Sequence, residues 1–225
     1  MSASSTVKDL HAALTSILPE ACTMAVAQIE PQVNTFSEEC AHLADAAPHR
    51  INEFLTGRQC ARAALASQGV GAVAIMSDAD GVPVWPEAWR GSITHSRGLC
   101  VAVVGAESRY TYLGLDLEKT NRLGEAAIKR VVHADEAAWV AGDQSRASLL
   151  FSAKEAFYKA QFPQWRCPGN FHDLVLEVDE AKQVASIAKL SEQFPQELRA
   201  EANSFQFHYQ FVDDYVVTLC SHVTL

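Results

Sequence analysis

Hydrophobic and polar residues are arranged along the chain in two successive groups of helices and strands. In the first group, the pattern predicts a strand at 22–30, helices at 37–46 and 48–68, a loop with short extended pieces at 82–94, and a strand at 99–105. The prolines and glycines of the 82–94 segment are the reason for expecting a loop there.

A turn near residues 106–111 separates this group from the next. We expect a strand at 112–118, helices at 124–132, 134–142 and 145–161, and strands at 174–178, 204–212 and 215–220. Pro163 and Pro168 are expected to end the helical part. Elements in this order predict an α+β fold made of two similar halves, residues 1–106 and 107–225.

The composition is that of a folded globular protein, because 48% of the 225 residues are hydrophobic and 20% are charged. A net charge of −9 argues against a protein that coats nucleic acid. Six cysteines without a CxxC pair predict reduced thiols in a cytoplasmic protein. We expect neither a signal peptide nor a membrane span, since the longest apolar run, around residues 99–106, is far too short to cross a bilayer.

Two acidic side chains share one face of the strand predicted at 112–118. In the sequence GLDLE (114–118), Asp116 and Glu118 are two residues apart and therefore point the same way, with backbones about 7 Å apart. Leu115 and Leu117 point to the opposite face, toward a core. Paired carboxylates suit a hard cation such as Mg²⁺. A solvated strand end has the same pattern, so this motif alone leaves both interpretations open.

The predicted helix 145–161 contains the sequence FSAKEAFYK (151–159). Glu155 and Lys159 lie one turn apart on the same face, and Lys154 lies on another flank. A solvent-facing ion pair would look the same. Apolar residues at helical spacing form one stripe that should face the core: Leu149, Ala153, Ala156, Phe157 and Ala160.

Two further segments carry groups that bind phosphate. In GSITHS (91–96), Thr94 and His95 can donate hydrogen bonds from a polar loop. Arg58 and Arg62 lie one turn apart on the helix 48–68, and the planar guanidinium suits phosphate. A satisfied loop histidine and exposed helix arginines are the alternatives. A Ser-His nucleophile is disfavoured, because no G-x-S-x-G elbow occurs.

Together and in this order, GR (57–58), GSITHS, GLDLE and FSAKEAFYK resemble one family. They are similar to the 4'-phosphopantetheinyl transferases of the monomeric surfactin/enterobactin-synthetase type, nearest the enterobactin synthetase component D branch. The likeness covers residues 50–160. The chain departs from the pattern at Gly81-Val82-Pro83, where many members have Gly-Lys-Pro with a lysine near the coenzyme A phosphate.

The resemblance implies a pseudo-dimer of two α+β halves with coenzyme A and Mg²⁺ in the cleft between them. Such an enzyme transfers phosphopantetheine from coenzyme A to a serine of an apo acyl, peptidyl or aryl carrier protein, and acts as a monomer. By motif position, the metal ligands are Asp116, Glu118 and Glu155, the phosphate ligands are Thr94, His95, Arg58, Arg62, Lys154 and Lys159, and the catalytic pair is Glu155 and Lys159.

The carrier would also need a docking surface. Carriers of this class are generally acidic, as this chain is, so we expect a locally basic patch at Arg122, Lys129 and Arg130. A solvated helix face is the alternative. Two rival functions stay open at this point: a different Mg²⁺-dependent phosphoryl enzyme, such as a nucleotide hydrolase, and a non-catalytic protein that binds coenzyme A.

Overall fold

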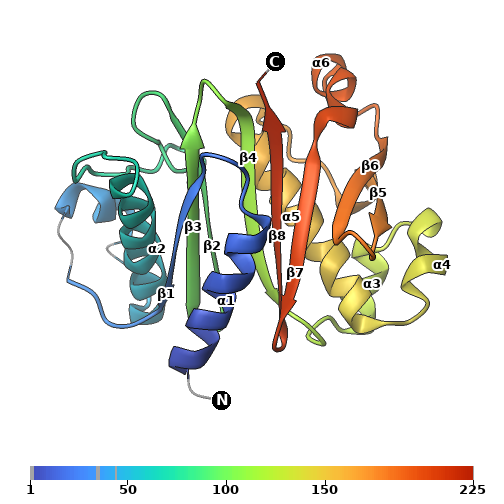
Figure 1. Cartoon of the computed structure of the whole chain (residues 1–225), viewed down its shortest axis with the longest axis horizontal. Helices are drawn as coiled ribbons and strands as arrows, with labels where there is room; N and C mark the ends of the chain where they lie inside the picture. Colours follow the sequence, from blue (N-terminus) through green and yellow to red (C-terminus); the bar gives the residue numbers. More distant parts are fainter. Residues whose placement is uncertain (1–2, 34–35, 44, 225) are drawn as a thin grey trace.

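The computed structural model describes residues 3–33, 36–43 and 45–224, which form an α+β fold with two antiparallel sheets (Figure 1). The first sheet has the order β1-β3-β2, from strands β1 (Thr23–Gln28), β2 (Trp89–Ser96) and β3 (Leu99–Ala106). The second has the order β4-β8-β7-β6-β5, from β4 (Tyr110–Lys119), β5 (Leu174–Asp179), β6 (Val184–Leu190), β7 (Gln206–Val212) and β8 (Tyr215–Val223). The predicted fold class is confirmed.

The two sheets meet at β2 and β4, which lie side by side. Here side-chain oxygens of β2 replace the backbone acceptors of an ordinary ladder. The backbone N–H of Leu115 donates to Ser92 Oγ at 3.0 Å, and that of Leu117 donates to Thr94 Oγ1 at 3.2 Å. Both hydroxyl side chains are buried, so these bonds satisfy β4 donors that water cannot reach.

Three long helices cover the sheets. Helix α2 (Pro48–Ala66) packs on the first sheet through an alanine-rich face, and α5 (Gln144–Trp165) packs on β4 and β8 of the second. Helix α1 (Ala3–Ile17) lies on the face of the sheets opposite to α5, as Figure 1 shows. The leucines of α1 join a core cluster with residues from β3, β4 and β8. This shared cluster binds the two sheets into one packed body.

Short helical segments complete the chain. They are η1 (Ser37–Leu43), α3 (Glu125–Val131), η2 (Ala134–Glu136), α4 (Ala137–Val140), η3 (Phe171–Asp173), α6 (Gln196–Ala200) and η4 (Ala202–Ser204). Within the described residues, no helix is long and apolar enough to cross a membrane.

Three sequence predictions about the elements need correction. The GSITHS segment is not in a loop but in β2, where the hydroxyls of Ser92 and Thr94 accept hydrogen bonds from β4 of the neighbouring sheet. Helix α5 does not stop at Pro163, because a proline near the end of a helix removes only one hydrogen bond. It ends at Trp165 and is followed by Arg166, whose φ is 52°. Helix α1 and strand β6 were not predicted.

Candidate functional site

The candidate site begins where β4 and α5 approach each other unusually closely. A Cβ at Gly114 would lie 1.9 Å from the backbone oxygen of Ala156, so only glycine fits there. The approach brings side chains from three elements together. Lys159 Nζ donates to Asp116 Oδ1 at 2.6 Å and to Thr94 Oγ1 at 3.1 Å, and Thr94 Oγ1 donates to Asp116 Oδ1 at 3.2 Å.

Two more carboxylates lie near this junction. Glu118 accepts a hydrogen bond from Arg122 at 3.0 Å. Burial raises the pKa of Glu118, an effect that Arg122 opposes. The pKa of Glu155 is raised by burial first and by the Asp116 carboxylate second, and Lys159 opposes the rise. The fold therefore holds three acidic groups within electrostatic range of one another.

The chemistry of these groups fits a hard cation. Asp116 Oδ2 is buried and has no hydrogen-bond partner among the described residues, which is costly unless another group binds it. Burial raises the pKa of Glu118 and of Glu155, and neither Arg122 nor Lys159 fully offsets the rise. Across the part of the chain that the structure describes, however, no three acidic, His or Cys groups are arranged as a ready metal site. Instead, Lys159 forms a salt bridge with Asp116, and Arg122 forms one with Glu118.

A cavity of about 300 Å³ opens beside this junction, between α2, β2 and α5; we call it the smaller cavity. His95 lines it, with Arg50 NH1 3.0 Å from His95 Nε2 and Glu53 Oε1 3.7 Å from His95 Nδ1. Burial lowers the pKa of His95, and Glu53 opposes that shift. Lys159 lines the cavity from the α5 side. The smaller cavity therefore has cations from α2, which packs on the first sheet, and from α5, which packs on the second.

Arg58 lies at the back of the smaller cavity and is almost fully buried. Its Nε donates to Ile75 O at 2.7 Å, its NH2 group donates to Ser77 Oγ at 2.8 Å, and the guanidinium lies over the Phe54 ring. Burial lowers its pKa to about 10, so the group keeps its charge at neutral pH.

The structure does not bring Arg62 to this cavity. Its guanidinium pairs with the buried carboxylate of Glu39 at 2.5 Å. Arg58 lines the cavity and Arg62 does not, because Glu39 holds the Arg62 guanidinium elsewhere, so a phosphate-binding role for Arg62 stays a prediction. The sequence analysis missed Arg50. Helical spacing could have identified Arg50, because residues at i, i+3, i+4, i+7 and i+8 share one face of a helix. Here those residues are Arg50, Glu53, Phe54, Gly57 and Arg58.

Lys154 also lies away from the predicted phosphate ligands. Its ammonium is 2% exposed and donates to Glu136 Oε2 at 2.7 Å, Val131 O at 2.8 Å and Phe171 O at 3.0 Å. An ammonium has three protons, so all of its donors are used. Glu136 in turn accepts from the backbone N–H of Leu176. In this structure Lys154 joins α5 to its neighbours, and its role as a phosphate ligand stays a prediction.

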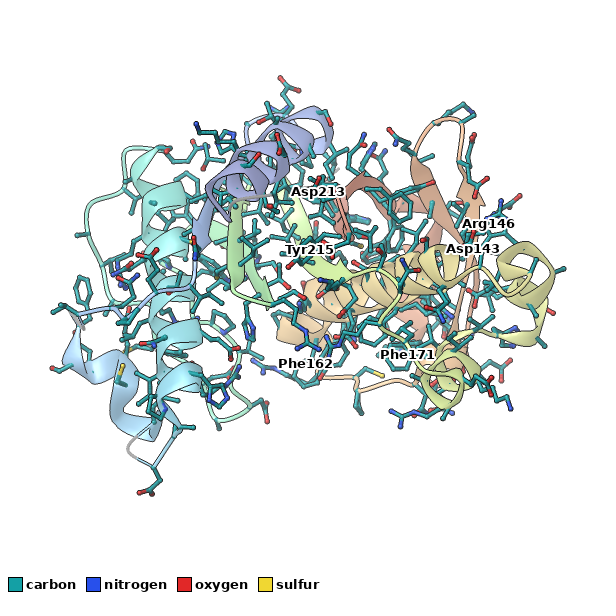
Figure 2. All side chains as sticks on the ribbon, turned by 90° about the horizontal axis from the view of Figure 1, so that it is seen from below. Asp143, Arg146, Phe162, Phe171, Asp213 and Tyr215 are labelled. Carbon is teal, nitrogen blue, oxygen red and sulfur yellow. The ribbon has the colours of Figure 1, made fainter. Side chains whose placement is uncertain are left out.

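A second cavity, of about 690 Å³, lies on the other side of α5; we call it the larger cavity. Figure 2 shows α5 running from Asp143 and Arg146 to Phe162. Tyr158 lines both cavities, while Glu155 faces only the larger one. The rim of the larger cavity includes the cations Lys129 and Arg130. Its remaining walls are mixed: one set is apolar, from Phe157, Phe171, Leu174, Phe194 and Pro168, and the other is polar, from Lys154, Gln161, Asn170, His172 and Asp173.

Comparison with known families agrees with this arrangement. Residues 38–105 match the 4'-phosphopantetheinyl transferase N-terminal domain, and residues 112–220 match the 4'-phosphopantetheinyl transferase superfamily. The chain belongs to this superfamily. The resemblance inferred from the four motifs is confirmed, and both family matches contain motif segments that line the two cavities.

Curated relatives of this superfamily include the 4'-phosphopantetheinyl transferase Svp of Streptomyces mobaraensis, 36% identical over 67% of this chain and 63% of that protein. PptT of Mycobacterium tuberculosis is 36% identical over 59% of this chain and 60% of its own length. Enterobactin synthase component D of Escherichia coli is 28% identical over 81% of this chain and 82% of that protein. The matched segments thus span less than two thirds of Svp and PptT.

Solved structures with a similar chain path include two holo-acyl-carrier-protein synthases. The Thermotoga maritima enzyme has a TM-score of 0.36 and 18% identity, and the match covers 50% of this chain and 63% of that one. The Chronobacterium ammoniagenes complex with coenzyme A has a TM-score of 0.35 and 21% identity, over 51% of this chain and 98% of that one.

Proposed function

We propose that this protein transfers the 4'-phosphopantetheine moiety of coenzyme A to a serine of an apo acyl, peptidyl or aryl carrier protein, and releases adenosine 3',5'-bisphosphate. One observation carries the proposal. Asp116, Glu155 and Lys159 lie between two cavities: the smaller one is lined by the cations Arg50, Arg58 and Lys159, and the larger one has walls of mixed apolar and polar residues. Coenzyme A suits this arrangement, because its nucleotide carries phosphates and its pantetheine arm combines apolar carbons with two amides and a hydroxyl.

The two halves then have different tasks. Residues 1–106 supply Arg50, Arg58 and His95, which would bind the phosphates of the nucleotide in the smaller cavity. Residues 107–225 supply Glu155 and the walls of the larger cavity, which would receive the pantetheine arm and the carrier serine. Thr94 lies where the halves meet and would contact the pyrophosphate.

Asp116, Glu118 and Glu155 would hold Mg²⁺. When bound, the cation would neutralise negative charge on the pyrophosphate oxygens as the bond to the leaving group breaks. The orphaned Asp116 Oδ2 and the raised pKa values of the two glutamates support this assignment. Lys159 and Arg122, which pair with two of these carboxylates, would then be free to turn toward phosphate.

The reaction balances with groups of this chain. The carrier serine oxygen forms a bond to the phosphorus that bears pantetheine, and the bond from that phosphorus to the oxygen of adenosine bisphosphate breaks. Glu155 would accept the serine proton, because it lines the larger cavity that would receive the carrier serine. Lys159 would stabilise the negative charge on the leaving phosphate.

The similarity to enterobactin synthase component D supports a carrier from siderophore or related peptide synthesis. We further propose that the protein works in the cytoplasm as a monomer. A panel of apo-carriers incubated with coenzyme A and Mg²⁺ tests the proposal, because intact-mass spectrometry detects an added phosphopantetheine. Cleavage of coenzyme A without any apo-carrier would instead indicate a hydrolase.

The residue assignments have their own test. Asp116→Ala, Glu118→Ala and Glu155→Ala should each nearly abolish transfer while the protein stays folded. Glu177→Ala is the matched control, because this carboxylate is exposed on β5 and should leave turnover unchanged. Near-normal turnover of Glu155→Ala at saturating Mg²⁺ would show that Glu155 is neither a metal ligand nor the base.

A further inference from the structure

A small hairpin, residues 76–84, forms one wall of the smaller cavity. The backbone N–H of Val84 donates to Met76 O at 2.9 Å, and that of Asp78 donates to Val82 O at 2.9 Å. Asp78 Oδ1 accepts from the backbone N–H groups of Asp80 and Val82, and Gly81 has a φ of 81°. The tip, residues 80–83, faces the cavity. It carries no cation, so it contributes shape to the wall.

The hairpin is held at its base and at its tip by different means. At the base, buried Arg58 donates to Ser77 Oγ and Ile75 O. At the tip, Arg166 reaches across from the end of α5, in the other half of the chain. Its NH2 group lies 2.6 Å from Asp78 Oδ2 and its NH1 group lies 3.0 Å from Asp80 Oδ2.

The position of Arg166 is set by the end of α5. Its backbone adopts the left-handed conformation, with a φ of 52°, and its guanidinium lies over the ring of Phe162. Phe162 and Pro163 line the smaller cavity opposite the hairpin tip. The two ion pairs therefore join the hairpin, one wall of the smaller cavity, to the end of the helix that forms the opposite wall.

The ion pairs at the tip of the hairpin differ in strength from the buried contacts of Arg58 at its base. The side chains of Arg166 and Asp80 are 41% and 58% exposed, and ion pairs at such positions are weak and screened by salt. The tip can therefore open to admit a ligand while the base stays fixed. A ligand that touches the closed wall should in turn strengthen the closed state, because binding and closure are linked.

We propose that Arg166 and the hairpin form a clamp that retains the nucleotide of coenzyme A in the smaller cavity. This inference rests on the proposed function. Arg166 is a positioning residue: it contacts the hairpin, and the hairpin contacts the nucleotide. The clamp should lower the dissociation rate of coenzyme A and leave the chemical step unchanged.

Arg166→Gln tests the clamp, because it removes the charge and keeps a non-glycine residue in the left-handed conformation. Arg146→Gln is the matched control. Arg146 pairs with both oxygens of Glu180 and lies over Trp139, but it lines neither cavity. Calorimetry and stopped-flow kinetics with coenzyme A should show about two- to fivefold weaker binding for Arg166→Gln, from faster dissociation. Arg146→Gln should bind like the unchanged protein.

Three further results are expected. The difference between Arg166→Gln and the unchanged protein should shrink in about 1 M salt, where the screening length is about 3 Å. kcat at saturating coenzyme A should be the same in both. Asp80→Asn should weaken binding less than Arg166→Gln, because the ion pair of Arg166 with Asp78 remains. The double variant Arg166→Gln/Asp80→Asn should be little weaker than Arg166→Gln alone, because that change already breaks both ion pairs.

The outcomes separate the clamp from the proposed function. If the unchanged protein does not bind coenzyme A, the proposed function is wrong and the clamp with it. If the unchanged protein binds and Arg166→Gln binds equally well at low salt, the clamp alone is wrong. A loss confined to kcat, or an equal loss in Arg146→Gln, would also overturn the clamp.

Discussion

Replacing Lys154 with methionine should destabilise the protein strongly without removing its affinity for coenzyme A. The side chains of Lys154 and Glu136 are 2% and 1% exposed, and their charges lie 2.7 Å apart. Removing one partner of such a buried pair leaves the other charge without compensation. That loss typically lowers the free energy of unfolding by about 3–5 kcal/mol. This is a large fraction of the about 5–15 kcal/mol that stabilises an ordinary domain.

The geometry also predicts how a second substitution acts. Glu136→Gln keeps a side-chain oxygen that can accept the hydrogen bond from the backbone N–H of Leu176, but it removes the negative charge. The double variant Lys154→Met/Glu136→Gln should therefore lose less stability than the sum of the two single variants, since no unpaired charge is left buried. Lys189→Met is the control: its ion pair with Asp135 is exposed, so its urea midpoint should hardly move.

Urea unfolding at low temperature gives the stabilities, and calorimetry on the folded variants gives the affinity for coenzyme A. The reasoning requires a lower midpoint and an unchanged affinity for Lys154→Met. A variant that unfolds like the unchanged protein, yet binds coenzyme A many times more weakly, would refute it. Lys154 would then be the phosphate ligand that its motif position first predicted.

Three further predictions concern the ligands and the pH. His95→Ala and Arg50→Ala should each weaken binding of coenzyme A more than of dephospho-coenzyme A, by about 1.5–3 kcal/mol, if they contact the 3'-phosphate; equal losses by calorimetry would exclude that contact. Replacing Lys129 and Arg130 with glutamate should raise the KM for an acidic carrier and leave the affinity for coenzyme A unchanged, and the rise in KM should become smaller as the salt concentration increases. Unchanged carrier kinetics at low salt would place the docking site elsewhere. Because burial raises the pKa of Glu155, the free energy of unfolding should fall as pH rises from 4.5 through that raised pKa, and it should fall less in Glu155→Gln. Urea titrations that find the same pH dependence in both proteins would contradict this prediction.

Arg122 is left out of the charge reversal for a structural reason. It was predicted with Lys129 and Arg130 as part of one docking patch. In the structure its guanidinium pairs with Glu118, one of the proposed metal ligands. Reversing its charge would therefore disturb the proposed metal site and the docking surface together, and the kinetic result would not separate them.

The parts of the site that follow from side-chain periodicity were predictable from the sequence. Leu115 and Leu117 are buried in the core, as the two-residue period of β4 requires. The stripe on α5 is likewise buried, and Glu155 and Lys159 point away from its centre. Within one element, geometry fixes which residues share a face, so local sequence is sufficient.

Positions that depend on distant partners were not predictable in this way. Lys154 lies off the apolar stripe of α5, and a residue there is exposed on an isolated helix. It is buried because η2, η3 and the end of α3 cover that flank. Arg62 has the right spacing to join Arg58, yet Glu39 holds it elsewhere. In both cases a carboxylate far away in the sequence decides where the cation goes.

The segment GSITHS shows why a functional strand can be mistaken for a loop. Its polar residues at 92, 94 and 96 are buried, contrary to the usual pattern of a strand with an apolar inner face. They face β4 because the two sheets are joined there by hydroxyl groups rather than by a backbone ladder. Thr94 has one proton and two acceptor positions, and all are used: it donates to Asp116 and accepts from Leu117 N–H and Lys159. The hydroxyl that joins the sheets is thus the one that orients the acid and the lysine. A site built in this way can form only when both halves have folded against each other, so neither half could carry the proposed reaction alone.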